Sequence, residues 1–137
     1  MPTKFTSLLL LFIGNKTIVE TKTGSNPDDA SDGAFLTEFI SPDGTSCTIK
    51  DLNNPKIDDF ESGNVDQFTG SILGPCENYR PQTISSVKIT HTSGDGWRGE
   101  YIKIYYAEKS FICILGQTLE NKASITFPCR ASKGKNK

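Results

Sequence analysis

The stretch ISSVKITHTSGDGWRGEYIKIYY, residues 84–106, contains the alternation that decides the fold class. Its first half places Val87 and Ile89 between polar neighbours, and its second half does the same with Ile102 and Ile104. Alternation with a period of two is typical of a β-strand that buries one face, and the glycines between the two halves favour a turn. The stretch therefore predicts two strands joined by a turn.

Short runs of the same kind recur along the rest of the chain. The 137 residues include 12 Gly and 7 Pro, which indicates many turns, and no helical apolar pattern extends beyond a turn or two. Further strands are expected at residues 17–23, 34–40, 47–52 and 125–129, with a hairpin turn at Pro42-Asp43-Gly44. The length suits one domain, so the sequence predicts a single all-β domain.

The charges of the chain are balanced. Fifteen Lys and Arg stand against 16 Asp and Glu, for a net charge of -1. Binding to nucleic acid, or long-range attraction to an anionic membrane, requires an excess of basic residues. We therefore expect no nucleic-acid partner, and we expect a monomer.

The two ends of the chain differ in composition from its middle. Residues 1–14, MPTKFTSLLLLFIG, place one Lys before an apolar core at 8–13. Such a core is too short to span a bilayer as a helix but resembles a secretory signal peptide. The alternative is an apolar N-terminal strand packed on the domain. The domain itself is expected at 15–130, followed by a loose basic tail at 131–137.

Four cysteines form an even set without a C-x-x-C pair: Cys47, Cys76, Cys113 and Cys129. Because the chain has only one His, zinc is disfavoured. Two disulfides would agree with secretion into an oxidising, extracellular setting. Three connectivities are possible; turn-forming residues between Cys113 and Cys129 favour that pair on neighbouring strands. Free buried thiols are the alternative.

An acidic stretch, DLNNPKIDDFESGNVDQFTG, occupies residues 51–70. Its apolar residues Ile57, Phe60, Val65 and Phe68 could pin a long loop to a core, and long pinned loops are often functional. Five carboxylates share the stretch: Asp51, Asp58, Asp59, Glu61 and Asp66. Carboxylates held in such a loop suit a hard cation, whereas the alternative is a solvated acidic loop.

Five pieces in order carry a family resemblance: Thr21-Lys22-Thr23-Gly24, Ala30-Ser31-Asp32, DDFESGNVDQF at 58–68, GDGWRGEYIKI at 94–104, and Phe127-Pro128-Cys129. They resemble the PLAT domain, found at one end of lipoxygenases and pancreatic-type lipases and as stand-alone secreted proteins. Residues 110–122 depart from the family pattern. The resemblance implies an eight-stranded antiparallel β-sandwich of two sheets.

The resemblance also implies loops at one sandwich end that bind calcium and help the domain settle on lipid surfaces or partner proteins. Carried over by position, the candidate ligands are Asp32 with the backbone of Ala30 and Ser31, Asp58, Glu61 and Asp95. Calcium takes six to eight oxygens, so carboxylates from several converging loops can supply a site. The alternative is that these acids only cap turns.

Trp97 follows the turn at 93–96 and has two interpretations. Large aromatic side chains are well buried on average, which favours packing at the end of the sandwich. The other interpretation places the indole at a loop tip, as a membrane or partner contact.

No catalytic pattern stands out. The chain has one His, His91, expected to face a neighbouring strand, and it lacks a Gly-x-Ser-x-Gly elbow and a phosphate-binding glycine loop. We therefore expect no enzyme. The sequence favours a stand-alone, calcium-assisted module that binds lipid surfaces or a protein partner. The alternative is a secreted, disulfide-stabilised structural or defence-type protein without lipid affinity.

Overall fold

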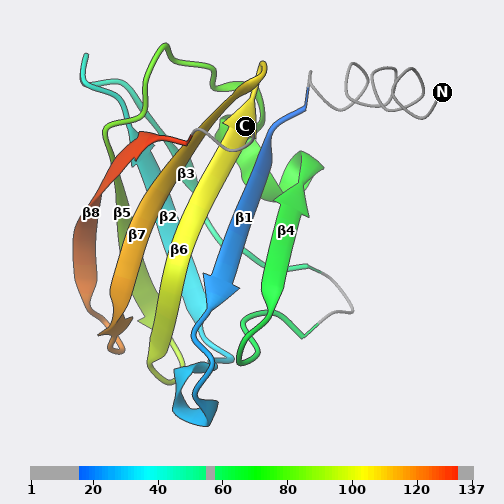
Figure 1. Ribbon diagram of the computed structural model, residues 1–137, viewed down its shortest axis with the longest axis vertical. Helices are drawn as coiled ribbons and strands as arrows, with labels where there is room; N and C mark the ends of the chain where they lie inside the picture. Colours follow the sequence, from blue (N-terminus) through cyan, green and yellow to red (C-terminus); the bar gives the residue numbers. More distant parts are fainter. Residues whose placement is uncertain (1–15, 55–57, 133–137) are drawn as a thin grey trace, which may run out of the picture.

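The computed structural model describes residues 16–54 and 58–132, which form eight antiparallel strands (Figure 1). The strands are β1 (Ile18–Thr23), β2 (Ala34–Ile40), β3 (Ser46–Ile49), β4 (Val65–Thr69), β5 (Ser86–Ser93), β6 (Trp97–Tyr106), β7 (Lys109–Leu119) and β8 (Ser124–Ala131). Two 3₁₀ segments, η1 (Pro27–Asp29) and η2 (Gly70–Asn78), lie in the connections.

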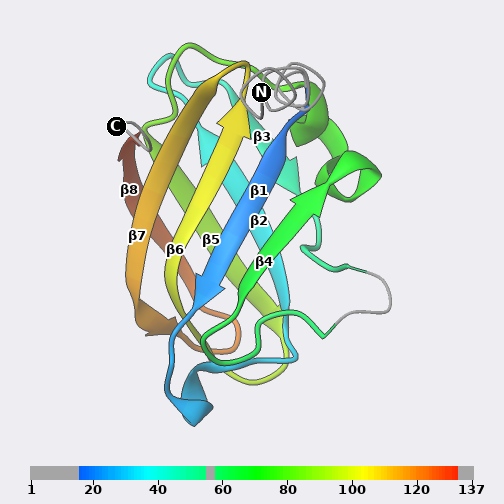
Figure 2. The ribbon, with the colours of Figure 1, turned by 45° about the vertical axis from the view of Figure 1, so that its right-hand side comes forward.

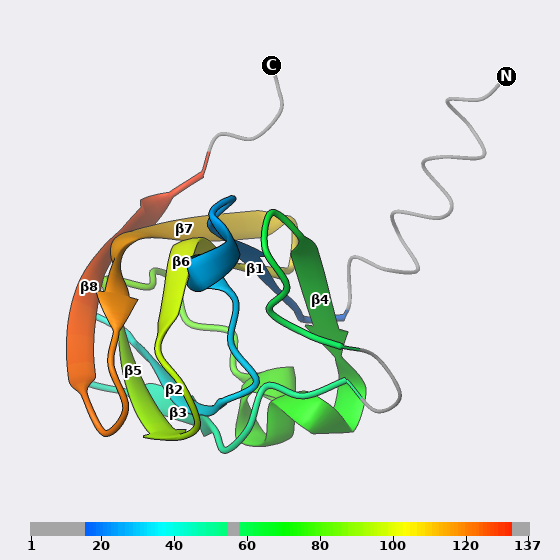
Figure 3. The ribbon, with the colours of Figure 1, turned by 90° about the horizontal axis from the view of Figure 1, so that it is seen from below.

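The strands follow the order β3-β2-β5-β8-β7-β6-β1-β4, and β8 belongs to both layers. Its first part pairs with β5, as in Val87 opposite Phe127, and its last part pairs with β7, as in Cys113 opposite Cys129. Seen from below, β7, β6, β1 and β4 form one layer and β5, β2 and β3 the other, with β8 joining them (Figure 3). The predicted all-β sandwich is confirmed, and its two layers are one curled sheet.

Alternation along the strands places the core between the two layers. Phe35 and Phe39 of β2 face inward, and so do Ile102 and Ile104 of β6; all four are at most 1% exposed. Strands of the two layers cross at an angle as they pack (Figure 2). Fully burying a side chain of this size contributes roughly 1.5–3 kcal/mol, so these inward rows hold the layers together.

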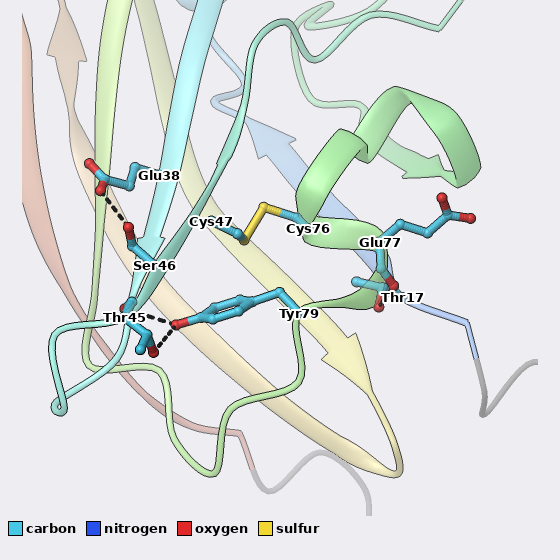
Figure 4. Close-up of a disulfide and its surroundings, with 8 residues drawn as sticks. All are labelled: Thr17, Glu38, Thr45, Ser46, Cys47, Cys76, Glu77 and Tyr79. Atoms are coloured by element: carbon cyan, nitrogen blue, oxygen red, sulfur yellow. Dashed lines mark hydrogen bonds between the residues drawn. A yellow bond between two sulfur atoms is a disulfide. The ribbon is translucent and has the colours of Figure 1, made fainter.

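All four cysteines are paired, as Cys47–Cys76 and Cys113–Cys129. The second pair joins β7 to β8, which confirms the predicted pair and rules out free thiols. The first pair ties β3 to η2 (Figure 4). Beside it, the Tyr79 hydroxyl donates to the Thr45 carbonyl at 2.9 Å, so η2 and the start of β3 are joined twice.

The predicted strands are confirmed, and the structure delimits two more strands and shortens one. The sequence-based prediction treated β4 as part of a loop, and it expected a strand at Cys113, which lies in β7, without giving its bounds. The turn at 93–96 joins strands of opposite layers, since β5 pairs with β2 and β8 whereas β6 pairs with β1 and β7. Strand β3 ends at Ile49, before the predicted end at 52.

Residues 1–15, 55–57 and 133–137 lie outside the described residues, and they include the predicted signal peptide, Ile57 and most of the predicted basic tail. Within 16–54 and 58–132, no helix is long and apolar enough to span a membrane.

Candidate metal centre

Three loops meet at the lower end of the sandwich in Figure 1: loop A (residues 24–33), loop B (58–64) and loop C (94–96). Backbone hydrogen bonds join loop B to loop A, from the Gly63 amide to the Gly24 carbonyl at 2.8 Å and from the Ser31 amide to the Phe60 carbonyl at 3.1 Å. The Gly24 amide in turn donates to the Arg98 carbonyl of β6 at 2.9 Å. The relative positions of the loops are therefore set by the backbone.

Phe60 fastens loop B to the core. Its side chain is 3% exposed, and its ring centroid lies 5.0 Å from that of Phe35 and 5.2 Å from that of Trp97. Its backbone has φ +63°, a conformation that costs a non-glycine residue of order 1 kcal/mol or more. The Phe60 amide donates to the Asp66 carboxylate at 2.9 Å, which helps to hold this conformation. The acidic neighbours of Phe60 are thereby held next to a fixed anchor.

Trp97 belongs to the same aromatic cluster and is 3% exposed. Its indole N–H donates to the Thr23 hydroxyl at 3.0 Å, and its ring lies so close to Gly99 that a Cβ there would be 2.4 Å from the ring. The prediction of a membrane or partner contact at Trp97 is wrong, because the side chain has no free surface or free donor. The alternative, packing at the sandwich end, is what the structure has.

Four carboxylates at this end of the molecule serve the backbone. Each accepts a hydrogen bond from a main-chain amide: Asp29 from Asn26 at 3.1 Å, Asp59 from Asn54 at 2.7 Å, Asp66 from Phe60 at 2.9 Å and Asp95 from Asp32 at 3.2 Å. These carboxylates therefore stabilise the backbone conformations of the loops. This role was not predicted for the first three, although short acidic side chains beside turn residues are its usual signal.

Three other carboxylates converge instead. One oxygen each of Asp32, Asp58 and Glu61 lies within 4.8 Å of the others. Among the described residues, none of these carboxylates has a hydrogen bond or ion pair. Asp32 and Asp58 are exposed and Glu61 is half-buried. They flank the points at which loop A and loop B are fixed, so the folded backbone brings the like charges together.

The donor set of this cluster fits calcium. Calcium prefers hard oxygen ligands at about 2.3–2.6 Å, so two oxygens on one ion lie at most about 5.2 Å apart. The spacing of 4.8 Å or less is within that limit. Without a cation, carboxylates this close repel one another.

Asp95 lies beside the cluster and has different contacts. Its carboxylate accepts from the Asp32 amide and from the Ser31 hydroxyl, both at 3.2 Å, and its carbonyl accepts from the Ser31 hydroxyl at 2.8 Å. The hydrogen bond from the Asp32 amide is the main cause that holds the pKa of Asp95 below its usual value. The structure therefore brings three of the four predicted ligands together, whereas the fourth, Asp95 of loop C, is hydrogen-bonded to Ser31 and Asp32 of loop A. Ala30 is half-buried and Ser31 is buried.

The acidic loops also perturb Asp66. Burial raises the pKa of Asp66, and the charge of Asp59 raises it further, against the lowering effect of the hydrogen bond from the Phe60 amide. The raised pKa means that ionising Asp66 in the folded protein costs free energy, chiefly because the carboxyl group is buried.

A depression of about 360 Å³ opens next to the cluster. Asp32 and Asp58 lie on its wall, together with Ser31, Gly33, Ala34, Asp51, Leu52, Asn53, Asp59 and Phe60. It is mostly polar and open to solvent, so small ions can reach Asp32 and Asp58 from this side.

No family model matches the sequence, and no curated protein matches it. Solved structures do match by fold. Alpha toxin from Clostridium absonum superposes with a TM-score of 0.64 at 20% identity over 85% of this chain, and Clostridium perfringens alpha-toxin with 0.64 at 17% over 82%. Coral 8R-lipoxygenase, described as calcium-activated through a C2-like domain, superposes with 0.68 at 14% over 83%.

The chain spans 31%, 30% and 17% of the length of those proteins, in that order, so the likeness concerns one part of each. At these identities it establishes the fold. The protein has a PLAT-like, C2-like β-sandwich.

Proposed function

We propose that the protein is a calcium-assisted binding module that attaches to lipid surfaces through loops A and B. The observation that carries this proposal is the convergence of Asp32, Asp58 and Glu61 within 4.8 Å, with no hydrogen bond or ion pair inside the described part of the chain. The calcium activation ascribed to the C2-like domain of the coral enzyme supports it.

The local charge explains why a cation would be needed. Three carboxylates repel an anionic headgroup, and the net charge of -1 supplies no compensating long-range attraction. Bound calcium would reverse the local sign and, because it takes six to eight oxygens, would have positions left for lipid phosphate. Asp32, Asp58 and Glu61 would hold the ion at the sandwich end, while Phe60 keeps loop B in place.

An apolar contact is also available beside the loops. Val65 directly follows loop B and is 49% exposed, one of the two large apolar side chains with high exposure among the described residues. A side chain in this position can insert between headgroups while the carboxylates hold the ion. Val65 replaces Trp97 as the expected interfacial residue.

The remaining features fit a secreted binding protein. Two disulfides suit an oxidising, extracellular compartment. His91 is fully buried against Phe35 and bonds a backbone carbonyl, so its surroundings are those of a structural residue. We propose a monomeric protein that has no catalytic activity of its own.

Co-sedimentation with vesicles tests the proposal. Wild-type protein should pellet with phosphatidylcholine–phosphatidylserine vesicles in millimolar calcium and stay in solution with a chelator. Asp58→Asn and Glu61→Gln should abolish pelleting. Asp43→Asn is the matched control, because Asp43 is an exposed acid that accepts hydrogen bonds from Thr45 in the β2–β3 turn, away from the cluster.

Two results would contradict the proposal in different ways. If the protein binds calcium but not vesicles, the proposed attachment to lipid surfaces is wrong and a protein partner is the better hypothesis. If the protein binds no calcium, and the cluster variants bind vesicles as well as wild type does, the proposed calcium site is wrong.

A further inference from the structure

We infer that Asp95 and Ser31 form a clamp that positions Asp32 for the metal, so that Asp95 is a positioning residue and not a ligand. This inference rests on the proposed calcium site and adds to it the device that sets the geometry of one ligand. The clamp joins loop C to loop A through side-chain and backbone groups.

The hydroxyl of Ser31 is the centre of the clamp. Its hydrogen is shared between the Asp95 carbonyl at 2.8 Å and the Asp95 carboxylate at 3.2 Å. Its oxygen accepts from the Gly33 amide at 2.9 Å. Because Ser31 is only 3% exposed, this hydroxyl is committed to partners inside the protein.

Asp32 is held on both sides as a result. Its own amide donates to the Asp95 carboxylate at 3.2 Å, and the next amide along the chain, that of Gly33, donates to Ser31. With the backbone fixed at residues 31–33, the exposed Asp32 side chain leaves loop A in a direction set by the clamp. That direction takes it to the carboxylates of Asp58 and Glu61.

The two loops also meet backbone to backbone. A Cβ on Gly94 would lie 2.5 Å from the Gly33 Cα, and Gly94 has φ +95°, so this position in loop C requires glycine. Close approach is what brings Asp95 within reach of the Asp32 amide.

A buried group supports the clamp from below. Nε2 of His91 bonds the Asp95 carbonyl, and the fully buried imidazole lies edge-on to Phe35 with ring centroids 4.7 Å apart. Loop C is therefore tied to the same aromatic core that holds Phe60 in loop B. Both sides of the metal centre have one rigid support.

Conservative and non-conservative variants separate a positioning role from a ligand role. Asp95→Asn keeps an oxygen that can accept from the Asp32 amide, so calcium affinity should stay within about threefold of wild type, whereas loss of a hydrogen bond to a charged group should weaken Asp95→Ala about tenfold or more. Ser31→Ala should weaken binding in the same direction, although Ser31 offers no charge. Asp43→Asn serves as the control.

The measurements are calcium titration by calorimetry and hydrogen exchange of the Asp32 amide in the calcium-free protein. Exchange should quicken in Asp95→Ala and Ser31→Ala and stay slow in Asp95→Asn. If Asp95→Ala does not fold, Ser31→Ala and Asp95→Asn carry the comparison.

The possible failures are distinguishable. The clamp is overturned if wild type binds calcium, Asp95→Asn lowers the calcium affinity as much as Asp58→Asn does, and Ser31→Ala leaves it unchanged. Asp95 would then be a ligand. Wild type that binds no calcium would overturn the clamp together with the proposed function.

Discussion

Replacing Phe60 by alanine tests whether an aromatic anchor holds loop B. The ring is 3% exposed and packs against Phe35, Phe68 and Trp97. Truncating a phenylalanine of this burial typically lowers the free energy of unfolding by about 3–5 kcal/mol, including the cavity that is left. Domains of this size have a total stability of about 5–15 kcal/mol, so the loss is a large fraction of the total and should be measurable by urea denaturation.

The comparison of Phe60→Ala with Phe60→Gly tests the backbone as well. In ordinary strand or helix conformations, glycine is less stable than alanine by roughly 0.5–1 kcal/mol. At φ +63°, alanine keeps the strain that a Cβ causes and glycine does not. We therefore expect Phe60→Gly to be at least as stable as Phe60→Ala, against the usual order.

Two outcomes would refute this reasoning. Surface substitutions usually change stability by about 0.5 kcal/mol or less, so a loss in that range for Phe60→Ala would mean that the ring is not in the core. A Phe60→Gly variant clearly less stable than Phe60→Ala would mean that the residue does not have the left-handed backbone conformation. The denaturant slope should be equal in all variants, since the unfolded surface is nearly the same.

Three further predictions follow from contacts described above. With a dissociation constant of about 10⁻⁴ to 10⁻³ M, calcium at about 5 mM should raise the unfolding free energy by roughly 1–2 kcal/mol, measured as a higher urea midpoint. Because the pKa of Asp66 is raised in the folded protein, the free energy of unfolding should fall as pH rises from about 4 through that pKa. The Asp66→Asn side chain can still accept from the Phe60 amide, so this variant should lose less stability across that range in thermal melts. At pH 7 it should be no less stable than wild type. Trp97 emission should be blue in the free protein and should not move when vesicles and calcium are added, because the indole is buried; a shift would contradict its place in the core.

The two strands that the sequence pattern did not delimit have physical explanations. In β4 the inward positions are Asp66 and Phe68, while Val65 faces solvent. Asp66 is buried because it accepts the Phe60 amide, so a carboxylate occupies a position where the pattern requires an apolar residue. In β7 both faces are apolar in the run from Phe111 to Leu115, which hides the alternation.

The candidate site was predictable in part, for a similar reason. Asp32, Asp58 and Glu61 were predicted together and do converge, although calcium binding itself stays a prediction. Asp95 was grouped with them because its position, in the piece at 94–104, matches the family resemblance. Asp95 differs from the other three because its carboxylate accepts a hydrogen bond from the Asp32 amide. The direction of a backbone amide in a loop cannot be predicted from the sequence pattern.

The shared strand β8 leaves the curled sheet with two free edges, β3 and β4. Both are short, at four and five residues, and η2 packs against both (Figure 3). Exposed strand edges are templates for pairing between molecules, and short, covered edges prevent it. The Cys47–Cys76 bond keeps η2 on β3, so reduction should free both edges and lead to aggregation through strand pairing. On this prediction, the disulfide would protect the solubility of the protein as well as its stability.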